Sequence, residues 1–291
     1  MIKPITRVAA VHDISGFGTA SLTVVIPILS TMKIQVCPFP TAVLSNHSAF
    51  NEYSFLDLTE HMKSYLDHWK KLNLDFDAIY SGFLGSPQQV NLVIELIEYF
   101  KKDDTITIVD PVLGDDGILY TPLSESMVSE MRKLISYSDI ITPNITEVSL
   151  LLGEKYADLG NKRKLKNSLL ALSDFGPSKI IITSVPDALG KNNSSVVAYD
   201  RVDGRFWQVQ CSYIPANFPG TGDTFTSVLT GSILQGDSLP IALDRAVQFV
   251  SIAIRATFGH STDPLEGIFL ERVLENLNAP VQISSYELLE W

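Results

Sequence analysis

The stretch Lys179-Ile180-Ile181-Ile182-Thr183 gives the clearest indication of the fold of this chain. Three consecutive β-branched isoleucines indicate a strand that is buried on both of its faces. Strands of this kind belong to parallel sheets, which helices cover on both sides. The stretch therefore predicts an α/β protein built around a mostly parallel sheet.

Alternating strands and helices extend this pattern toward the N-terminus. Strand-like and amphipathic helical runs follow one another with short polar breaks between them. Strands are expected at residues 8–11, 34–37, 76–80, 106–109, 140–142 and 179–183, and helices at 22–32, 56–72, 87–100, 123–135 and 147–152. Pro38 and Pro40 are expected to close the second strand.

The pattern changes after residue 183. The runs 195–199 and 206–211 flank Asp200-Arg201-Val202-Asp203-Gly204, which is typical of a hairpin. Helices are then expected at 224–234, 241–257 and 267–277. Because no linker or repeat interrupts this order, residues 1–291 are expected to form a single domain, a three-layer α/β/α sandwich. Ligands of such folds bind at the carboxyl ends of the strands.

Composition narrows the class of protein. The chain is 45% hydrophobic with a net charge of −11, and no run of Lys and Arg marks a nucleic-acid partner. No apolar run approaches the ~20 residues that cross a membrane, and the N-terminus lacks a signal-peptide pattern. A cytoplasmic protein is expected. Cys37 and Cys211 are expected to be buried free thiols.

The strongest local motif is Pro219-Gly220-Thr221-Gly222-Asp223-Thr224, directly before a predicted helix. Two glycines allow a ligand to approach the backbone closely, and the helix start offers unpaired N–H groups. This combination suits an anion hole for phosphate, with Asp223 placed to take a proton from an attacking hydroxyl. The alternative is a glycine-rich turn with Asp223 as a helix N-cap.

Carboxylates also follow two other predicted strands. Asp110 and Asp115 lie in Asp110-Pro111-Val112-Leu113-Gly114-Asp115, and Thr142-Pro143-Asn144 leads to Glu147. Asn144 and Glu147 can hold Mg²⁺ directly or through water, as Mg²⁺ sites beside phosphates do. The alternative for this pair is a helix capping box, whose spacing it matches.

Two common nucleotide motifs are missing. His12-Asp13-Ile14-Ser15-Gly16-Phe17-Gly18 resembles the dinucleotide fingerprint, but Ser21 replaces its third glycine and no acid follows until Glu52. An NAD-dependent oxidoreductase is therefore disfavoured. Gly190-Lys191 is followed by Asn192, so the Walker loop is absent too.

Two further patches stand beside predicted strands. In Ser45-Asn46-His47-Ser48 and Ser81-Gly82-Phe83-Leu84-Gly85, Phe83 can stack on a flat ring and His47 can bond a ring substituent. The alternative for each is a place in the core.

Taken in order, these blocks resemble the pyridoxal/pyridoxamine kinases of the ribokinase superfamily. The likeness runs from Val8 to the last helices. It rests on Ser45-Asn46-His47, Ser81-Gly82-Phe83-Leu84-Gly85, Asp110-Pro111-Val112-Leu113-Gly114-Asp115, Thr142-Pro143-Asn144 with Glu147, Thr183-Ser184 and Gly220-Thr221-Gly222-Asp223. It implies a ribokinase-like sandwich with a β-hairpin near the nucleotide site, around 195–211.

The resemblance also implies roles. Asp223 would be the catalytic base, and the backbone of Gly220, Thr221 and Gly222 the anion hole. The metal and the ATP phosphates would be served by Asp110, Asp115 and Glu147, and the nucleotide would be faced by Asn144, Thr183 and Ser184. The substrate would be bound by Asp13, Ser15, His47, Ser48, Phe83 and Asp223. The partners implied are ATP, Mg²⁺, a B6 vitamer and a second copy in a homodimer, and the participation of a monovalent cation is left open.

Two departures from the pyridoxal kinase pattern leave the choice of substrate open. Asp13 stands where many pyridoxal kinases have serine, and Phe83 where many have tyrosine. An acid at the first strand end also resembles the hydroxymethylpyrimidine kinases of the same superfamily. A catalytically silent vitamer-binding protein is the other alternative, although it would need neither Asp223 nor the glycines.

Overall fold

The computed structural model of the chain describes residues 5–121, 123–155, 161–186, 194–211, 214, 218–279 and 285–291. Within them a ten-stranded sheet has the order β12-β11-β10-β9-β8-β5-β4-β1-β2-β3. All neighbouring pairs from β9 to β2 are parallel. The strands are β1 (Thr6–Ser15), β2 (Ile34–Leu44), β3 (Phe55–Asp57), β4 (Ala78–Ser81), β5 (Ile106–Val109), β8 (Ile140–Ile141), β9 (Lys179–Pro186), β10 (Ser194–Asp200), β11 (Arg205–Cys211) and β12 (Tyr286–Leu289).

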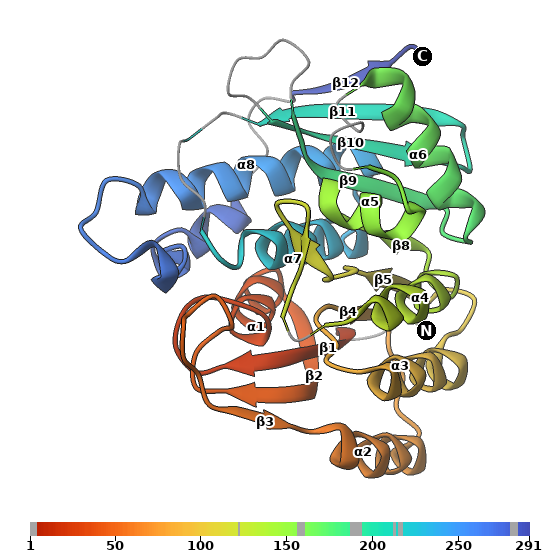
Figure 1. The fold of residues 1–291 in the computed structure, drawn as a ribbon, viewed down its shortest axis with the longest axis vertical. Coiled ribbons are helices and arrows are strands. Elements are labelled where there is room, and N and C mark those ends of the chain that lie inside the picture. The colour runs from red at the N-terminus through yellow and green to blue at the C-terminus, as the bar shows by residue number, and fades with distance from the viewer. Residues whose placement is uncertain are drawn as a thin grey trace.

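Helices cover both faces of this sheet (Figure 1). One buried cluster joins the sheet to α2 through α6, and the other joins it to α1, α7 and α8. The helices are α1 (Leu22–Thr31), α2 (Thr59–Leu72), α3 (Pro87–Phe100), α4 (Glu125–Ile135), α5 (Ile145–Leu152), α6 (Lys162–Asp174), α7 (Thr221–Leu234) and α8 (Leu239–Thr257). The predicted three-layer α/β/α sandwich is confirmed.

The isoleucine run behaves as its composition predicts. Ile180 and Ile182 pack into the cluster under α2 through α6, whereas Ile181 packs into the cluster under α1, α7 and α8. All three side chains are fully buried. A strand with apolar residues on both faces is stable only between two helical layers, and this requirement places β9 inside the sandwich.

The expectation that prolines close β2 is wrong. The strand continues through Pro38 and Pro40, which pair with Ala10 and His12 of β1. The neighbour on the other side, β3, pairs only with Ala42, Val43 and Leu44. The proline segment therefore has an open edge, where a missing N–H removes no ladder hydrogen bond.

Other element boundaries also differ from expectation. Residues 55–57 form β3 instead of the start of α2. The helix expected at 267–277 is replaced by short 3₁₀ turns, namely η2 (Pro264–Glu266), η3 (Leu270–Arg272) and η4 (Leu274–Asn278). Sequence patterns also gave no indication of α6, of β12, or of the small hairpin of β6 (Gly114–Asp115) and β7 (Ile118–Leu119), which stands out in yellow in Figure 1.

The predicted β10–β11 hairpin is present, but its turn lies away from the strand carboxyl ends. Because β10 runs antiparallel to β9, it reaches the amino-end edge of the sheet at Asp200, opposite Lys179. There the Arg201 N–H donates to the Ser178 carbonyl. The turn itself therefore lies at the edge opposite the strand carboxyl ends, and the hairpin approaches those ends with the other ends of β10 and β11, at Ser194 and Cys211.

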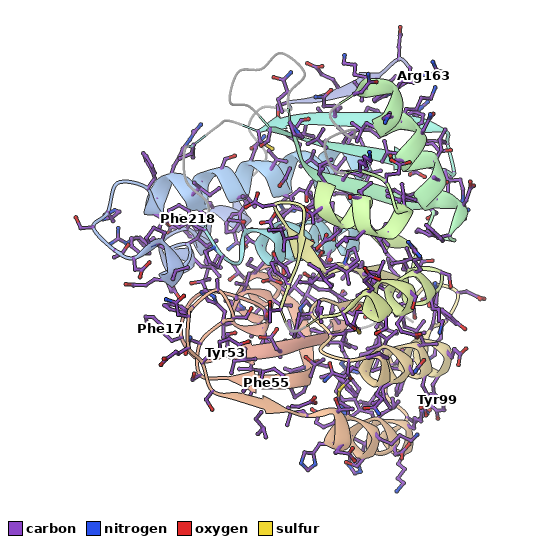
Figure 2. The ribbon with its side chains drawn as sticks, viewed as in Figure 1. Phe17, Tyr53, Phe55, Tyr99, Arg163 and Phe218 are labelled. Carbon is purple, nitrogen blue, oxygen red and sulfur yellow. The ribbon has the colours of Figure 1, made fainter. Side chains whose placement is uncertain are left out.

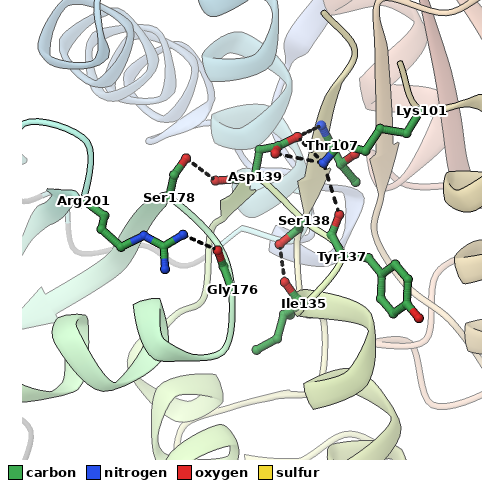
Figure 3. Close-up of polar contacts among 9 residues, drawn as sticks. All are labelled: Lys101, Thr107, Ile135, Tyr137, Ser138, Asp139, Gly176, Ser178 and Arg201. Carbon is green, nitrogen blue, oxygen red and sulfur yellow. Dashed lines mark hydrogen bonds and ion pairs between the residues drawn. The ribbon is translucent and has the colours of Figure 1, made fainter. Parts of the chain in front are cut away.

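Asp139 ties the strands together at the same edge (Figure 3). Its carboxylate accepts hydrogen bonds from the Thr107 N–H at 2.7 Å and from Lys101 Nζ at 2.8 Å. Its carbonyl accepts from the N–H groups of Ser178 and Lys179. The entries of β5, β8 and β9 are thus fixed to one another at the edge opposite the strand carboxyl ends.

In the described residues, no helix has both the length and the apolarity that a membrane crossing needs. Cys37 and Cys211 are free as expected, but both are half-buried instead of buried. Residues 1–4 and Gly190-Lys191-Asn192, considered above for targeting and phosphate binding, lie outside the described residues.

Candidate active site

Two cavities meet at the carboxyl ends of the parallel strands. The acidic cavity, of about 440 Å³, is lined by the carboxylates Asp110, Asp115, Glu147 and Asp223. The aromatic cavity, of about 510 Å³, is lined by Tyr53, Phe55, Phe83 and Tyr120. The two share a wall that includes Ser21, Phe83, Tyr120 and Asp223.

The structure brings the residues singled out from sequence into these two cavities. Those expected to bind a ring line the aromatic cavity, namely Asp13, Ser15, His47, Ser48, Phe83 and Asp223. Those expected to face phosphate, metal or nucleotide line the acidic cavity, namely Asp110, Asp115, Asn144, Glu147, Thr183, Ser184, Gly220, Thr221, Gly222 and Asp223. Sites that are distant in sequence are therefore adjacent where the strands end.

The start of α7 has a geometry that only glycine permits. Gly220 is the N-cap, with φ of +79°, and a Cβ there would lie 2.1 Å from the Thr19 carbonyl oxygen. At Gly222, by contrast, a Cβ would meet no described protein atom within 4 Å. The first N–H groups of a helix have no acceptor within the helix, so this turn presents donors to the acidic cavity.

Asp223 does not cap the helix, so that alternative is wrong. It follows Gly220 by three residues, and its Oδ2 atom accepts a hydrogen bond from the Ser21 N–H at 2.9 Å. Burial raises the pKa of Asp223 to about 6, the Ser21 N–H opposes this rise, and the nearby Asp13 charge adds to it. A carboxylate with such a pKa is ionised at neutral pH and is still basic enough to accept a proton.

Asp110 directly follows β5 and interacts electrostatically with Asp223. Its Oδ2 atom accepts from the Thr226 hydroxyl at 3.3 Å, and that hydroxyl is 3.0 Å from the Thr142 hydroxyl. Burial, followed by the Asp223 charge, raises the pKa of Asp110 to about 8. Without a cation nearby, this pair of acids therefore favours a proton on Asp110.

Asn144 and Glu147 form the capping box that their spacing allowed. Asn144 Oδ1 accepts from the Glu147 N–H at 2.9 Å, and Glu147 Oε2 accepts from the Asn144 N–H at 2.8 Å. Glu147 Oε1 also accepts from the Leu113 N–H at 3.2 Å. Burial and the Asp110 charge raise the pKa of Glu147. The pair therefore shapes α5 and faces the acidic cavity at once.

The acidic cavity fits a Mg²⁺ ion that arrives with phosphate. No lysine or arginine is among its described lining residues, so their carboxylates have no cationic side chain to balance them. The described residues also contain no group of three or more His, Cys, Asp or Glu that could hold a metal by themselves. Mg²⁺ beside phosphates usually takes only one or two carboxylates and completes its shell with phosphate oxygens and water.

Asp13 is the buried acid of the aromatic cavity, only 5% exposed. Its Oδ1 atom accepts from the Ser21 hydroxyl at 2.5 Å, and Oδ2 accepts from the Ser15 hydroxyl at 3.1 Å. Burial raises the pKa of Asp13, and both serine hydroxyls oppose that rise. A ligand with an N–H donor or a positive charge would complete this site.

His47 is held by its own chain. Its Nε2–H donates to the Leu265 carbonyl at 2.6 Å, and its Nδ1 accepts from the Ala49 N–H at 3.3 Å. Both ring nitrogens are therefore engaged, which fixes the loop at this end of the aromatic cavity. The expected bond from His47 to a ring substituent needs one of these contacts to open.

Sequence patterns did not indicate several lining residues. Tyr53 and Phe55 precede and begin β3, and Figure 2 shows them with Phe17 at one end of the sheet. Tyr120 follows the β6–β7 hairpin and borders both cavities. The available signal for Tyr120 was an aromatic residue shortly after Asp116-Gly117, a pair typical of tight hairpin turns.

Comparisons with known proteins agree with this geometry. The phosphomethylpyrimidine kinase family model matches residues 41–266. An Arabidopsis thaliana pyridoxal kinase is 27% identical over 255 residues, covering 84% of this chain and 80% of that protein.

Two solved structures are similar over nearly the whole chain. A Bacteroides thetaiotaomicron protein named as a phosphomethylpyrimidine kinase and crystallised with pyridoxal is 56% identical, with a TM-score of 0.95 over 98% of this chain and 100% of that one. Pyridoxal kinase from Lactobacillus plantarum is 29% identical, with a TM-score of 0.84 over 95% and 98%.

Proposed function

The chain belongs to the phosphomethylpyrimidine kinase family within the ribokinase superfamily, and we propose that it transfers the γ-phosphoryl group of ATP to the 5′-hydroxymethyl group of a vitamin B6 vitamer. The observation that carries the proposal is the meeting of the aromatic and acidic cavities at Asp223. A ring in one cavity and a triphosphate in the other would place a hydroxyl and a phosphorus atom on either side of this carboxylate.

In the proposed reaction Asp223 accepts the proton of the vitamer hydroxyl. The hydroxyl oxygen forms a bond to the γ-phosphorus while the bond from phosphorus to the β-phosphate oxygen breaks, which leaves ADP. The N–H groups of Gly220, Thr221 and Gly222 would stabilise charge on the transferring group, since such transfers rely chiefly on positioning and charge stabilisation.

Mg²⁺ would supply the positive charge that the acidic cavity lacks. Asp110, Asp115 and Glu147 would hold it directly or through water, and Asn144, Thr183 and Ser184 would contact the nucleotide. When bound, the ion offsets the repulsion between carboxylates and phosphates. The monovalent cation, the homodimer, the cytoplasmic location and a single domain over 1–291 stay predictions.

The proposal is tested by a phosphorylation assay with pyridoxal, pyridoxamine, pyridoxine and hydroxymethylpyrimidine. We expect turnover of at least one B6 vitamer that EDTA abolishes and Mg²⁺ restores. Hydroxymethylpyrimidine or its phosphate is the second candidate, because the matching family model is named for a phosphomethylpyrimidine. A higher kcat/KM for hydroxymethylpyrimidine would favour it, and vitamer binding without turnover would favour the silent binder.

Phe83→Ala should weaken vitamer binding selectively. The Phe83 side chain is half-buried on the shared wall, and stacking on an aromatic ring contributes ~1–3 kcal/mol. We expect the vitamer KM to rise by about tenfold or more while the ATP KM changes little. Phe17→Ala is the control, because Phe17 is 54% exposed at the same end of the sheet and lines neither cavity. Equal changes in both KM values would assign Phe83 to the core.

A further inference from the structure

Ser21 contacts both acids that border the aromatic cavity. Its backbone N–H donates to Asp223 Oδ2 at 2.9 Å, and its hydroxyl donates to Asp13 Oδ1 at 2.5 Å. The residue is 8% exposed and immediately precedes α1. One residue therefore connects the acid expected to read the ring with the proposed base.

The Ser21 backbone is in a conformation that favours glycine. Its φ is +53° and its ψ is −131°, whereas residues with a Cβ rarely adopt positive φ. Such strained residues persist only where surrounding contacts hold them, and they cluster at functional sites. Here the hydroxyl bond to Asp13 is a contact that glycine could not make, and it offsets the strain that the Cβ introduces.

We propose that Ser21 is a positioning residue, whose hydroxyl bond to Asp13 holds a strained backbone in the conformation that keeps its N–H on Asp223. The inference rests on the proposed function through the role of Asp223 as base. Ring binding at Asp13 and the orientation of the base are then coupled through Ser21.

The charged surroundings of Asp223 make this N–H consequential. Two acids lie near Asp223, namely Asp13 of β1 and Asp110, which follows β5. Two neutral phenols are also near it, Tyr80 of β4 and Tyr120, and the Asp223 charge helps to raise the pKa of each. None of these groups is a cation. The Ser21 N–H lowers the pKa of Asp223, so its loss would leave the base protonated up to a higher pH.

Two substitutions at Ser21 separate its hydroxyl from its backbone. Ser21→Ala leaves a Cβ on a backbone with positive φ but removes the hydroxyl bond to Asp13 that offsets the strain. The backbone should then relax, and its N–H should leave Asp223. Ser21→Gly also removes the hydroxyl, but glycine adopts positive φ without strain, so the N–H should stay. Ser15→Ala is the matched control, because the Ser15 hydroxyl donates to the other oxygen of Asp13 and, among the described residues, makes no hydrogen bond to Asp223.

We expect all three variants to raise the vitamer KM by about tenfold, since each removes a hydrogen bond to a charged group. Only Ser21→Ala should move the acid limb of the kcat/KM–pH profile upward, by about one pH unit. Ser21→Ala should also melt below Ser21→Gly, because alanine keeps the strain without the compensating bond.

An acid limb that is unmoved in Ser21→Ala, or moved equally in Ser21→Gly, would overturn the inference. A Ser21→Ala protein that melts at or above Ser21→Gly would overturn its premise of strain. Wild-type protein that phosphorylates no vitamer would instead refute the proposed function, and the melting comparison would still test Ser21.

Discussion

Asp223→Asn should lower kcat by ~10²-fold or more, within the range for a lost general base. Asparagine keeps the size of the side chain, and its amide oxygen can still accept from the Ser21 N–H, but it cannot take up the hydroxyl proton. The ATP KM should change little, or fall as repulsion between Asp223 and the phosphates is relieved. Initial rates over the vitamer and ATP concentrations measure both effects.

The same variant should remove a feature of the pH profile. Because burial raises the pKa of Asp223 to about 6 in the ligand-free protein, the wild-type kcat/KM should fall as pH drops through about 6 and protonates the base. Asp223→Asn should lack this acid limb at any residual activity. A variant with near-wild-type kcat and an intact limb would show that another group accepts the proton.

Gly222→Ala should abolish most activity without harming the fold, with kcat/KM for ATP down by ~10²-fold, comparable to the loss of one transition-state donor. An added methyl would meet no described protein atom within 4 Å, and the residue is helical. Alanine in a helix is more stable than glycine by ~0.5–1 kcal/mol, so the melting temperature should hold or rise. The methyl would instead obstruct the close approach of a phosphate.

Gly220→Ala is the contrasting variant. There the Cβ would lie 2.1 Å from the Thr19 carbonyl oxygen, and φ is +79°. Its activity should be lost together with thermal stability. If Gly222→Ala kept wild-type kcat/KM for ATP, the anion hole would have to lie elsewhere.

The fold class was predictable from sequence because a strand that is buried on both faces has a continuous apolar sequence. The run Ile180-Ile181-Ile182 indicated a strand with apolar side chains on both faces, and such a strand requires a helical layer on each side of the sheet. The extent of β2 was not predictable, since whether Pro38 interrupts a strand depends on which neighbour pairs with it. Likewise, the direction of the β10–β11 turn follows from antiparallel pairing with β9, which local sequence does not encode.

The site was predictable where a motif carried its own geometry. Gly220 to Asp223 combine glycines, a helix start and an acid, and they form the junction of the two cavities. Asn144 with Glu147 was ambiguous because one spacing serves both a cap and a ligand set. Tyr120 and Ser21 were not identified as site residues, since their positions depend on contacts with distant parts of the chain.

The order of strands has a consequence for synthesis on the ribosome. From β1 outward the sheet grows as β4, β5, β8, β9, β10 and β11, so each emerging strand can join the free edge. The helices α7 and α8 come after β11, and until they emerge only α1 covers the face that contains Ala10, Ile108 and Ile181. A nascent chain can thus pair its strands before the junction of the two cavities exists, because Gly220 and Asp223 arrive with α7. The face exposed longest to aggregation and chaperones is the one that α7 and α8 finally cover.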